Sequence, residues 1–173
     1  RRGVWFIIPH KKKLMNNKDI LNLEKVNYLK IKKNNEQSVF FKSTNGLLGF
    51  GWSHGSYGRS RDLKSVWSEG SQSFIIFENP YEDIKTLQLN IGKVMVNKKD
   101  PLIINLFVNR ILVKKLKIYN GSEQKINIDL KNQLKFGLNV IKFQIKNPIT
   151  PVSKLESVDG RLLGFNLKSY KFR

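Results

Sequence analysis

The apolar residues of this chain recur mainly at every second position, which is the spacing of a strand that buries one face. This alternation is clearest in Leu87–Ile91, Leu102–Val108, Ile126–Leu130 and Ile141–Ile145. Further strands are predicted at Val4–Ile8, Tyr28–Lys32, Val39–Lys42, Ser73–Phe77, Ile111–Ile118 and Leu162–Leu167. Many short strands at regular spacing predict an all-β fold, an antiparallel and jelly-roll-like β-sandwich.

Turn-forming residues separate the predicted strands. Asn109-Arg110 stands between two apolar runs and predicts that Leu102–Val108 and Ile111–Ile118 form a hairpin. Asn120-Gly121 and the stretch from Asn97 to Pro101 predict further turns, so that hairpin follows hairpin along the chain. A helical stripe of apolar residues occurs only in the short, polar stretch Asp19–Lys25, and we expect little helix.

The length of the chain suggests one domain. The 173 residues suit a single β-sandwich domain, residues 1–173, and no linker composition divides them. The abrupt start at Arg1-Arg2 fits a piece excised from a longer protein. No apolar run reaches the roughly 20 residues that span a bilayer, so no transmembrane segment is predicted.

The charge is strongly positive. The sequence has 32 Lys and Arg against 13 Asp and Glu, a formal net charge of +19, which attracts polyanions or anionic membrane surfaces. A compositional bias towards Lys and Asn is the alternative explanation, and lysines on a strand also keep sheet edges from pairing. The basic runs Lys11–Lys13 and Lys30–Lys33 have only Tyr28 as a neighbouring aromatic, which predicts at most non-specific binding of nucleic acid.

Residues 43–80 differ from the rest, because they are neutral, rich in Gly and Ser, and contain two of the three Trp. We therefore expect a long structured loop here. A flat indole ring can stack on the C–H face of a sugar while polar side chains bond its hydroxyls. The candidate saccharide-binding residues are Trp52, Tyr57, Arg59, Trp67 and Glu69. The alternative is that both Trp rings pack between the sheets.

Catalytic and metal-binding patterns are weak. His10 and His54 are the only histidines, and neither Ser53 nor Ser56 lies in a G-x-S-x-G elbow, so we expect no enzyme. The absence of cysteine excludes disulfides and thiolate metal sites. No cofactor is expected, although Ca²⁺ bound by Asp and carbonyl oxygens in a loop is an alternative that the sequence leaves open.

Asp159 and Arg161, just before the last predicted strand, have the spacing of a charge-assisted clamp. We expect them to be structural, with a shared sugar site with Glu69 as the alternative. In a chain so rich in Lys, two acidic residues and an Arg are best explained by a local network of side chains. We therefore predict that Trp67, Glu69, Asp159 and Arg161 lie close together.

Four motifs are similar to a known pattern. They are GFGWS at Gly49–Ser53, VWSEGSQSFIIF at Val66–Phe77, NPITP at Asn147–Pro151 and LESVDGRLLGF at Leu155–Phe165. Their order, across Gly46 to Phe172, resembles the β-sandwich accessory domain of bacterial cell-envelope polysaccharide proteins, including glycosyltransferases and phosphoglycerol-transferase-like enzymes. Thr150 stands where that pattern usually has Ser, Gly160 where a bulkier residue is usual, and Arg59–Ser65 is an insertion.

The resemblance implies a non-catalytic, glycan-related accessory module of the cell envelope, on a side of the membrane that the sequence does not determine. Its implied partners are a saccharide or an anionic envelope polymer and a larger glycosyltransferase or membrane-associated protein. A structural or assembly domain that docks on a partner protein or an anionic membrane surface is the alternative, and non-specific nucleic-acid binding is the third.

Overall fold

The computed structural model describes residues 29–38, 50–54, 65–96, 100–154 and 158–173. This part of the chain forms strands and one short 3-10 turn, η1 (Pro151–Lys154). The strands are β1 (Leu29–Lys30), β2 (Glu36–Ser38), β3 (Trp52–His54), β4 (Val66–Glu69), β5 (Gln72–Asn79), β6 (Thr86–Val94), β7 (Leu102–Val108), β8 (Ile111–Ile118), β9 (Gln124–Asp129), β10 (Gly137–Ile145) and β11 (Leu163–Phe172).

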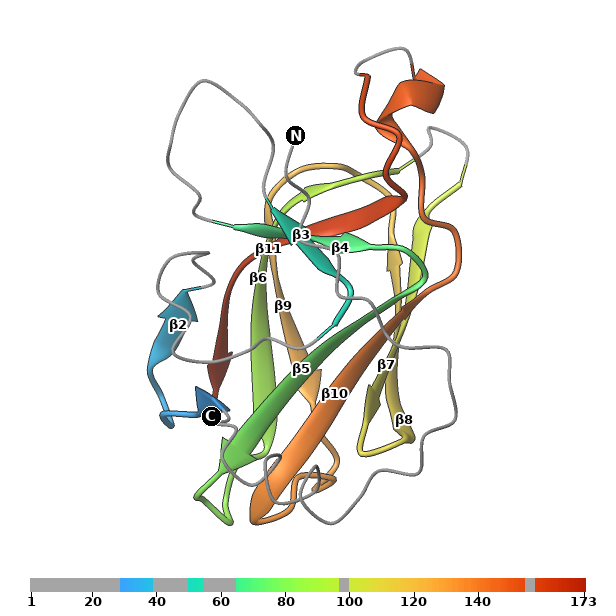
Figure 1. Ribbon diagram of the computed structural model, residues 1–173. Coiled ribbons are helices and arrows are strands. Elements are labelled where there is room, and N and C mark those ends of the chain that lie inside the picture. Colours follow the sequence, from blue (N-terminus) through green and yellow to red (C-terminus); the bar gives the residue numbers. More distant parts are fainter. Residues whose placement is uncertain (1–28, 39–49, 55–64, 97–99, 155–157) are drawn as a thin grey trace, which may run out of the picture.

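Two sheets face each other (Figure 1). Sheet A has the order β1-β5-β10-β7-β8, and sheet B has the order β3-β4-β11-β6-β9, with β2 also paired to β11. All of these pairs are antiparallel except β1 with β5, which is parallel. The predicted all-β sandwich is therefore confirmed.

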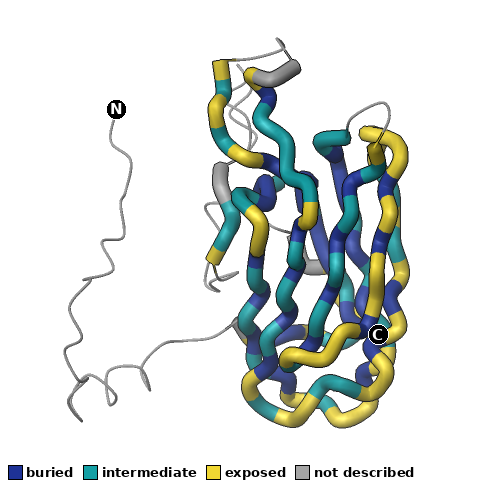
Figure 2. The backbone as a smooth tube through the Cα atoms, turned by 90° about the vertical axis from the view of Figure 1, so that its right-hand side faces the viewer, coloured by how far each residue is buried: buried dark blue, intermediate teal, exposed yellow. Residues whose placement is uncertain are grey.

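Period-two alternation builds the core between the sheets. In β5, β7 and β10 every second residue is buried and the others are partly exposed, as the tube in Figure 2 shows. The fully buried side chains include Ile75, Leu106, Phe143 and Phe165. Burying such a side chain stabilises the fold by about 1.5–3 kcal/mol, so the alternating runs supply most of the driving force.

The predicted β7–β8 hairpin is confirmed. Val108 pairs with Ile111, and the two turn residues both have positive φ, 47° at Asn109 and 78° at Arg110. This is the backbone of the two-residue turn that matches the twist of a hairpin. The Asn109 side chain fixes the turn to β10: its Nδ2 donates to Asn139 Oδ1 (2.8 Å), and its Oδ1 accepts from Val140 N (3.1 Å).

The prediction of a long loop over residues 43–80 is wrong in the described part, whereas the strand predicted at Ser73–Phe77 is confirmed as part of β5. β3, β4 and β5 lie there, and the Gly and Ser residues serve strands and tight turns. Gly70, with φ 75°, joins β4 to β5, while the buried Ser68 accepts a hydrogen bond from Phe165 N (2.9 Å). A buried serine is compatible with a strand when its hydroxyl has a hydrogen-bond partner. The high Ser content of this stretch therefore did not indicate a loop.

Other predictions differ from the structure or concern residues outside the described part. Asn120-Gly121 does not close a hairpin, because β8 belongs to sheet A and β9 to sheet B. The last predicted strand, Leu162–Leu167, is longer than expected and runs to Phe172. The strands predicted at Val4–Ile8 and Val39–Lys42 and the stripe at Asp19–Lys25 lie outside the described residues.

We predict that Asn139→Ala destabilises the protein by about 2–4 kcal/mol, measured by urea unfolding. Asn139 is fully buried, and its amide bonds Asn109 Nδ2, Lys135 N, Lys135 O and Gly137 O at 2.8–2.9 Å. Truncation leaves several buried polar groups unpaired, at about 1–3 kcal/mol each before relaxation. Asn127→Ala, which removes an exposed bond to Gln88, is the control and should change stability by less than about 0.5 kcal/mol. Equal effects would contradict this account of the turn.

Candidate functional site

The GFGWS motif joins the two sheets. Phe50 O accepts from Phe74 N (2.9 Å), and Gly51 O accepts from Glu69 N (2.8 Å) and from Ser73 Oγ (2.6 Å). Trp52 packs edge to face on Phe143 and Phe165, with ring centroids 5.8 and 5.7 Å apart, and its Nε1 donates to Phe74 O (2.7 Å). The Trp52 ring therefore serves packing, as the core interpretation expects.

Trp67 is also buried, with 8% of its surface exposed. It pairs with Ser53 on one side and Asn166 on the other, in the middle of β4. A ring this covered has no free face for a sugar. Glu69, at the end of β4, has intermediate exposure, while Tyr57 and Arg59 lie outside the described residues. A saccharide site shared by all five candidate residues therefore stays a prediction.

The Asp159–Arg161 pair forms as the spacing predicts. Arg161 Nε donates to Asp159 Oδ1 (2.9 Å) and Nη2 to Oδ2 (2.6 Å), and Arg161 N donates to Oδ1 (3.0 Å). About a quarter of each side chain is exposed. These hydrogen bonds hold the pKa of Asp159 below its ordinary value, against the opposing effect of burial.

The end of β4 reaches the same region through its backbone. Glu69 pairs with Leu163, and Gly70 N donates to Leu162 O (2.8 Å). The Arg161 guanidinium group bonds the carboxylate of Asp159. The wider convergence of Trp67, Glu69, Asp159 and Arg161 stays a prediction.

A surface that the sequence did not point to lies on the outer face of sheet A. There the register aligns one polar side chain from each of four neighbouring strands: Lys115 of β8, Asn105 of β7, Gln144 of β10 and Gln72 of β5. Asn105 Nδ2 donates to Gln144 Oε1 (3.1 Å). We call these four residues the amide row.

Beside the amide row runs a second outward row made of Leu112, Phe107, Lys142 and Phe74, again one residue from each strand. Lys142 stands between two phenylalanines, with its Nζ 4.3 Å from the Phe107 ring centroid. This cation–π contact holds the ammonium group over the sheet. We call these four residues the aromatic row.

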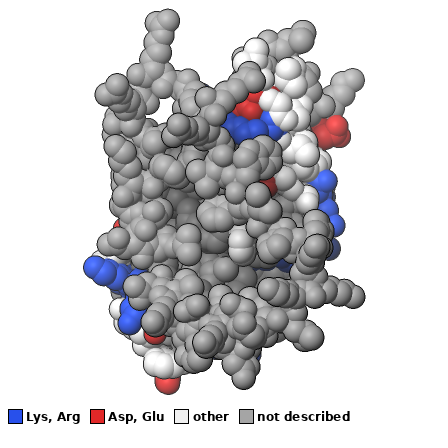
Figure 3. Space-filling view, in the orientation of Figure 1, with Lys and Arg blue, Asp and Glu red and all other residues white. Residues whose placement is uncertain are grey.

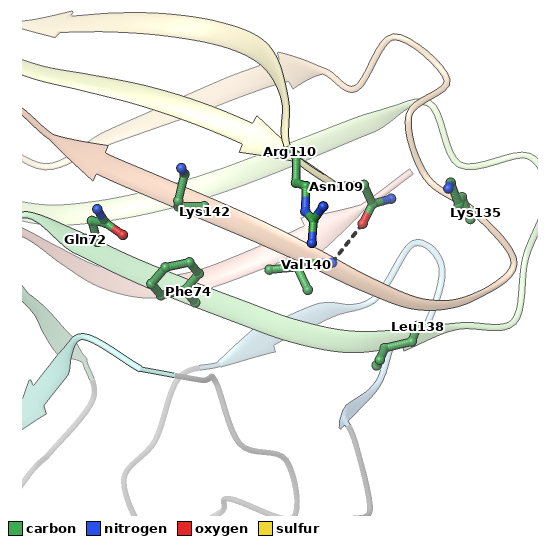
Figure 4. A pocket seen from close by; sticks show the side chains of 8 residues that line it. All are labelled: Gln72, Phe74, Asn109, Arg110, Lys135, Leu138, Val140 and Lys142. Atoms are coloured by element: carbon green, nitrogen blue, oxygen red, sulfur yellow. Dashed lines mark hydrogen bonds between the residues drawn. The ribbon is translucent and has the colours of Figure 1, made fainter. Parts of the chain in front are cut away.

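A groove of about 630 Å³ adjoins the two rows and shares Gln72 with the amide row and Phe74 and Lys142 with the aromatic row (Figure 4). It is lined by Gln72, Phe74, Asn109, Arg110, Lys135, Leu138, Val140 and Lys142. Three of these residues are cations and none is acidic. More lysines, among them Lys114 and Lys117, are exposed along the edge strand β8. In the view of Figure 3, described Lys and Arg side chains are visible at both lateral edges of the molecule.

The outer face of sheet B differs in chemistry. Its outward pairs across β6 and β9 are entirely polar: Thr86 with Asp129, Gln88 with Asn127, and Asn90 with Lys125. Carboxylates occur among them and nearby, where the Ser169 hydroxyl donates to Glu36 and lowers its pKa. On sheet A, aromatic, amide and basic side chains lie in adjacent rows of one outer face.

The described ranges contain no group of three or more His, Asp or Glu residues that could hold a metal ion. Within the same ranges, no helix has the length and apolar character needed to cross a bilayer.

No family model and no curated protein matches the chain. Among solved structures, a family 35 carbohydrate-binding module from an environmental isolate is similar at 16% identity, covering 84% of this chain and 90% of that one, with a TM-score of 0.43. The CBM36-1 domain of a multidomain xylanase from the hindgut metagenome of Trinervitermes trinervoides has 12% identity, coverages of 80% and 97%, and a TM-score of 0.45. CBM35 from Cellvibrio japonicus Abf62 has 10% identity, coverages of 80% and 91%, and a TM-score of 0.47. At these identities the likeness concerns the fold alone.

We predict that Arg161→Ala lowers the free energy of unfolding by about 1–3 kcal/mol at pH 7, because it breaks a partly buried, charge-assisted pair. The lowered pKa of Asp159 means that the pair contributes fully above the ordinary carboxyl pKa of about 3.9 and is lost as pH falls through the folded-state pKa. The destabilisation should therefore be constant from pH 7 to about pH 5 and shrink below about pH 4.

Lys168→Ala is the matched control for the clamp. It removes a more exposed ion pair, to Glu123, and should cost less than about 1 kcal/mol. Thermal melts of both variants across pH give the comparison. An Arg161→Ala protein that melts like the wild type at pH 7 would discard the clamp as a stabilising contact.

Proposed function

We propose that this protein is a non-catalytic saccharide-binding module that works with the machinery of bacterial surface polysaccharide synthesis. The observation that carries the binding role is the pair of adjacent rows on the outer face of sheet A. The four sequence motifs, through the family that they resemble, are the support for the link to polysaccharide synthesis.

The amide row suits the hydroxyl groups of sugars. Asn and Gln amides both donate and accept hydrogen bonds, which hydroxyls also do. Gln144 Oε1 accepts from Asn105 Nδ2 in the row, so the Gln144 amide group is oriented by a neighbour before any ligand arrives. Strands lie about 4.8 Å apart, and the row therefore repeats polar groups at a short, regular spacing across the sheet.

The aromatic row suits the other side of a sugar. The C–H face of a pyranose packs on aromatic and aliphatic side chains, and Phe74 and Phe107 both point outward with intermediate exposure. Leu112 and Leu138 extend this apolar surface and are 38% and 52% exposed. Together the two rows offer stacking and hydrogen bonding side by side, which a chain of sugars lying across the strands would use.

We predict that Gln144→Ala weakens saccharide binding by about fivefold, since one net hydrogen bond contributes about 1 kcal/mol. A glycan array identifies the ligand for the wild type, and calorimetric titration then measures the variant. Gln88→Ala is the matched control, because Gln88 also bonds an amide across strands, to Asn127, but on sheet B. It should bind like the wild type, and both variants should fold.

The bound polymer should be recovered uncut, since the proposed module is non-catalytic. Equal losses in the two glutamine variants would move binding away from sheet A. A wild type that binds no saccharide on the array would overturn the function itself. In the bacterium that makes this protein, Gln144→Ala should also reduce the yield or length of a surface polysaccharide, whereas Gln88→Ala should not.

A further inference from the structure

Arg110 occupies a backbone conformation that its side chain disfavours. It is the second residue of the β7–β8 turn and has φ 78°, in the left-handed region where glycine is the usual residue. A non-glycine residue there costs about 1 kcal/mol. Asn109, the first turn residue, is among the types that tolerate this region, but Arg is not. The fold would be served better by glycine at position 110.

The arginine side chain lies in the groove of sheet A. In Figure 4 it extends from the turn across β10 towards Val140, between Lys142 on β10 and Lys135 on the preceding loop. The three cations come from three different segments of the chain, and the fold brings them to one cavity. Strained residues concentrate where they serve a site, and here the strain places a guanidinium group.

The three cations are the main groups of the groove that a ligand could bind. The Asn109 amide is already occupied by Gln133 O, Asn139 Oδ1 and Val140 N. Lys142 is held over Phe107. With no carboxylate among the described residues that line the groove, three positive charges face the same volume, and a bound anion would relieve their mutual repulsion.

We propose that this groove binds an acidic group on the saccharide, so that the ligand is a polysaccharide carrying carboxylates or phosphates. The proposal rests on the saccharide-binding function and adds that the bound saccharide is acidic. Arg110 takes the anion through its planar fork, which matches both carboxylate and phosphate oxygens, and Lys135 and Lys142 supply further charge. The adjacent aromatic and amide rows bind the sugar rings on either side of that group.

The test compares Arg110→Gly with Lys131→Gly. Both changes remove one positive charge and place glycine at a positive-φ position, since Lys131 has φ 51°, but Lys131 does not line the groove. The probes are polygalacturonate, its neutral carboxyl-reduced form, and poly(glycerol phosphate), each titrated at physiological salt to screen non-specific attraction. Thermal melts check the fold.

Arg110→Gly should weaken binding of one acidic polymer about tenfold or more while keeping or raising the melting temperature, because the turn is relieved of strain. Lys131→Gly should stay within about twofold of the wild type. The acidic polymer that binds more tightly shows whether the groove prefers a carboxylate or a phosphate. Lys142→Met, which keeps the packing on Phe107, should reproduce the loss.

Three results would overturn the proposal. Equal losses for Arg110→Gly and Lys131→Gly would mean that only net charge matters. Unchanged binding of Arg110→Gly, with the wild type still binding both acidic and carboxyl-reduced polymers, would remove the anion site but leave the saccharide function standing. Binding of a DNA duplex as tightly as of the acidic polymers, lost in the same variant, would make the groove a nucleic-acid site.

Discussion

The approach of Gly51 to the start of β5 is the contact on which the arrangement of the two sheets depends. A Cβ atom at this position would lie 2.0 Å from Gln72 O, and the residue has φ 80°, so only glycine fits. The next residue, Trp52, then reaches Phe143 of sheet A and Phe165 of sheet B at once. Any side chain at position 51 would push β3 away from β5, uncover those rings, and displace the outward residues at the start of β5.

The motifs that stand out in the sequence mainly hold the fold. Ser68 bonds Phe165 N, and Gly164 lies close against Ser68 Oγ and Ile145, where a Cβ would be 2.7 Å from the hydroxyl oxygen. Asn147 connects β10 to β7, because its amide bonds Ile103 N (2.9 Å) and Pro101 O (2.8 Å). The proposed binding surface is instead made mostly of residues outside these motifs. The exceptions are Gln72 and Phe74, the outward-facing residues that alternate with the core in VWSEGSQSFIIF.

Local patterns in the sequence were enough for part of this structure. The strands β7, β8 and β10 and the turn at Asn109 follow from neighbouring residues, and so does the pairing of Asp159 with Arg161 two positions on. The short strand β4 was missed because buried serine looks like loop composition. The two rows of sheet A were beyond sequence reasoning, since they depend on the register of β10 against β5 and β7, whose residues lie far apart in the chain.

The position of β11 has a consequence for biosynthesis. Leu163–Phe172 lies in the middle of sheet B, between β4 and β6, and also pairs with β2. Until these residues leave the ribosome, β4 and β6 lack the strand that lies between them, and the edge of each that faces β11 stays unpaired. A nascent chain held in this state presents unpaired strand edges, which are the sites of misassembly that chaperones shield. Sheet B is therefore complete only once β11 is inserted between β4 and β6.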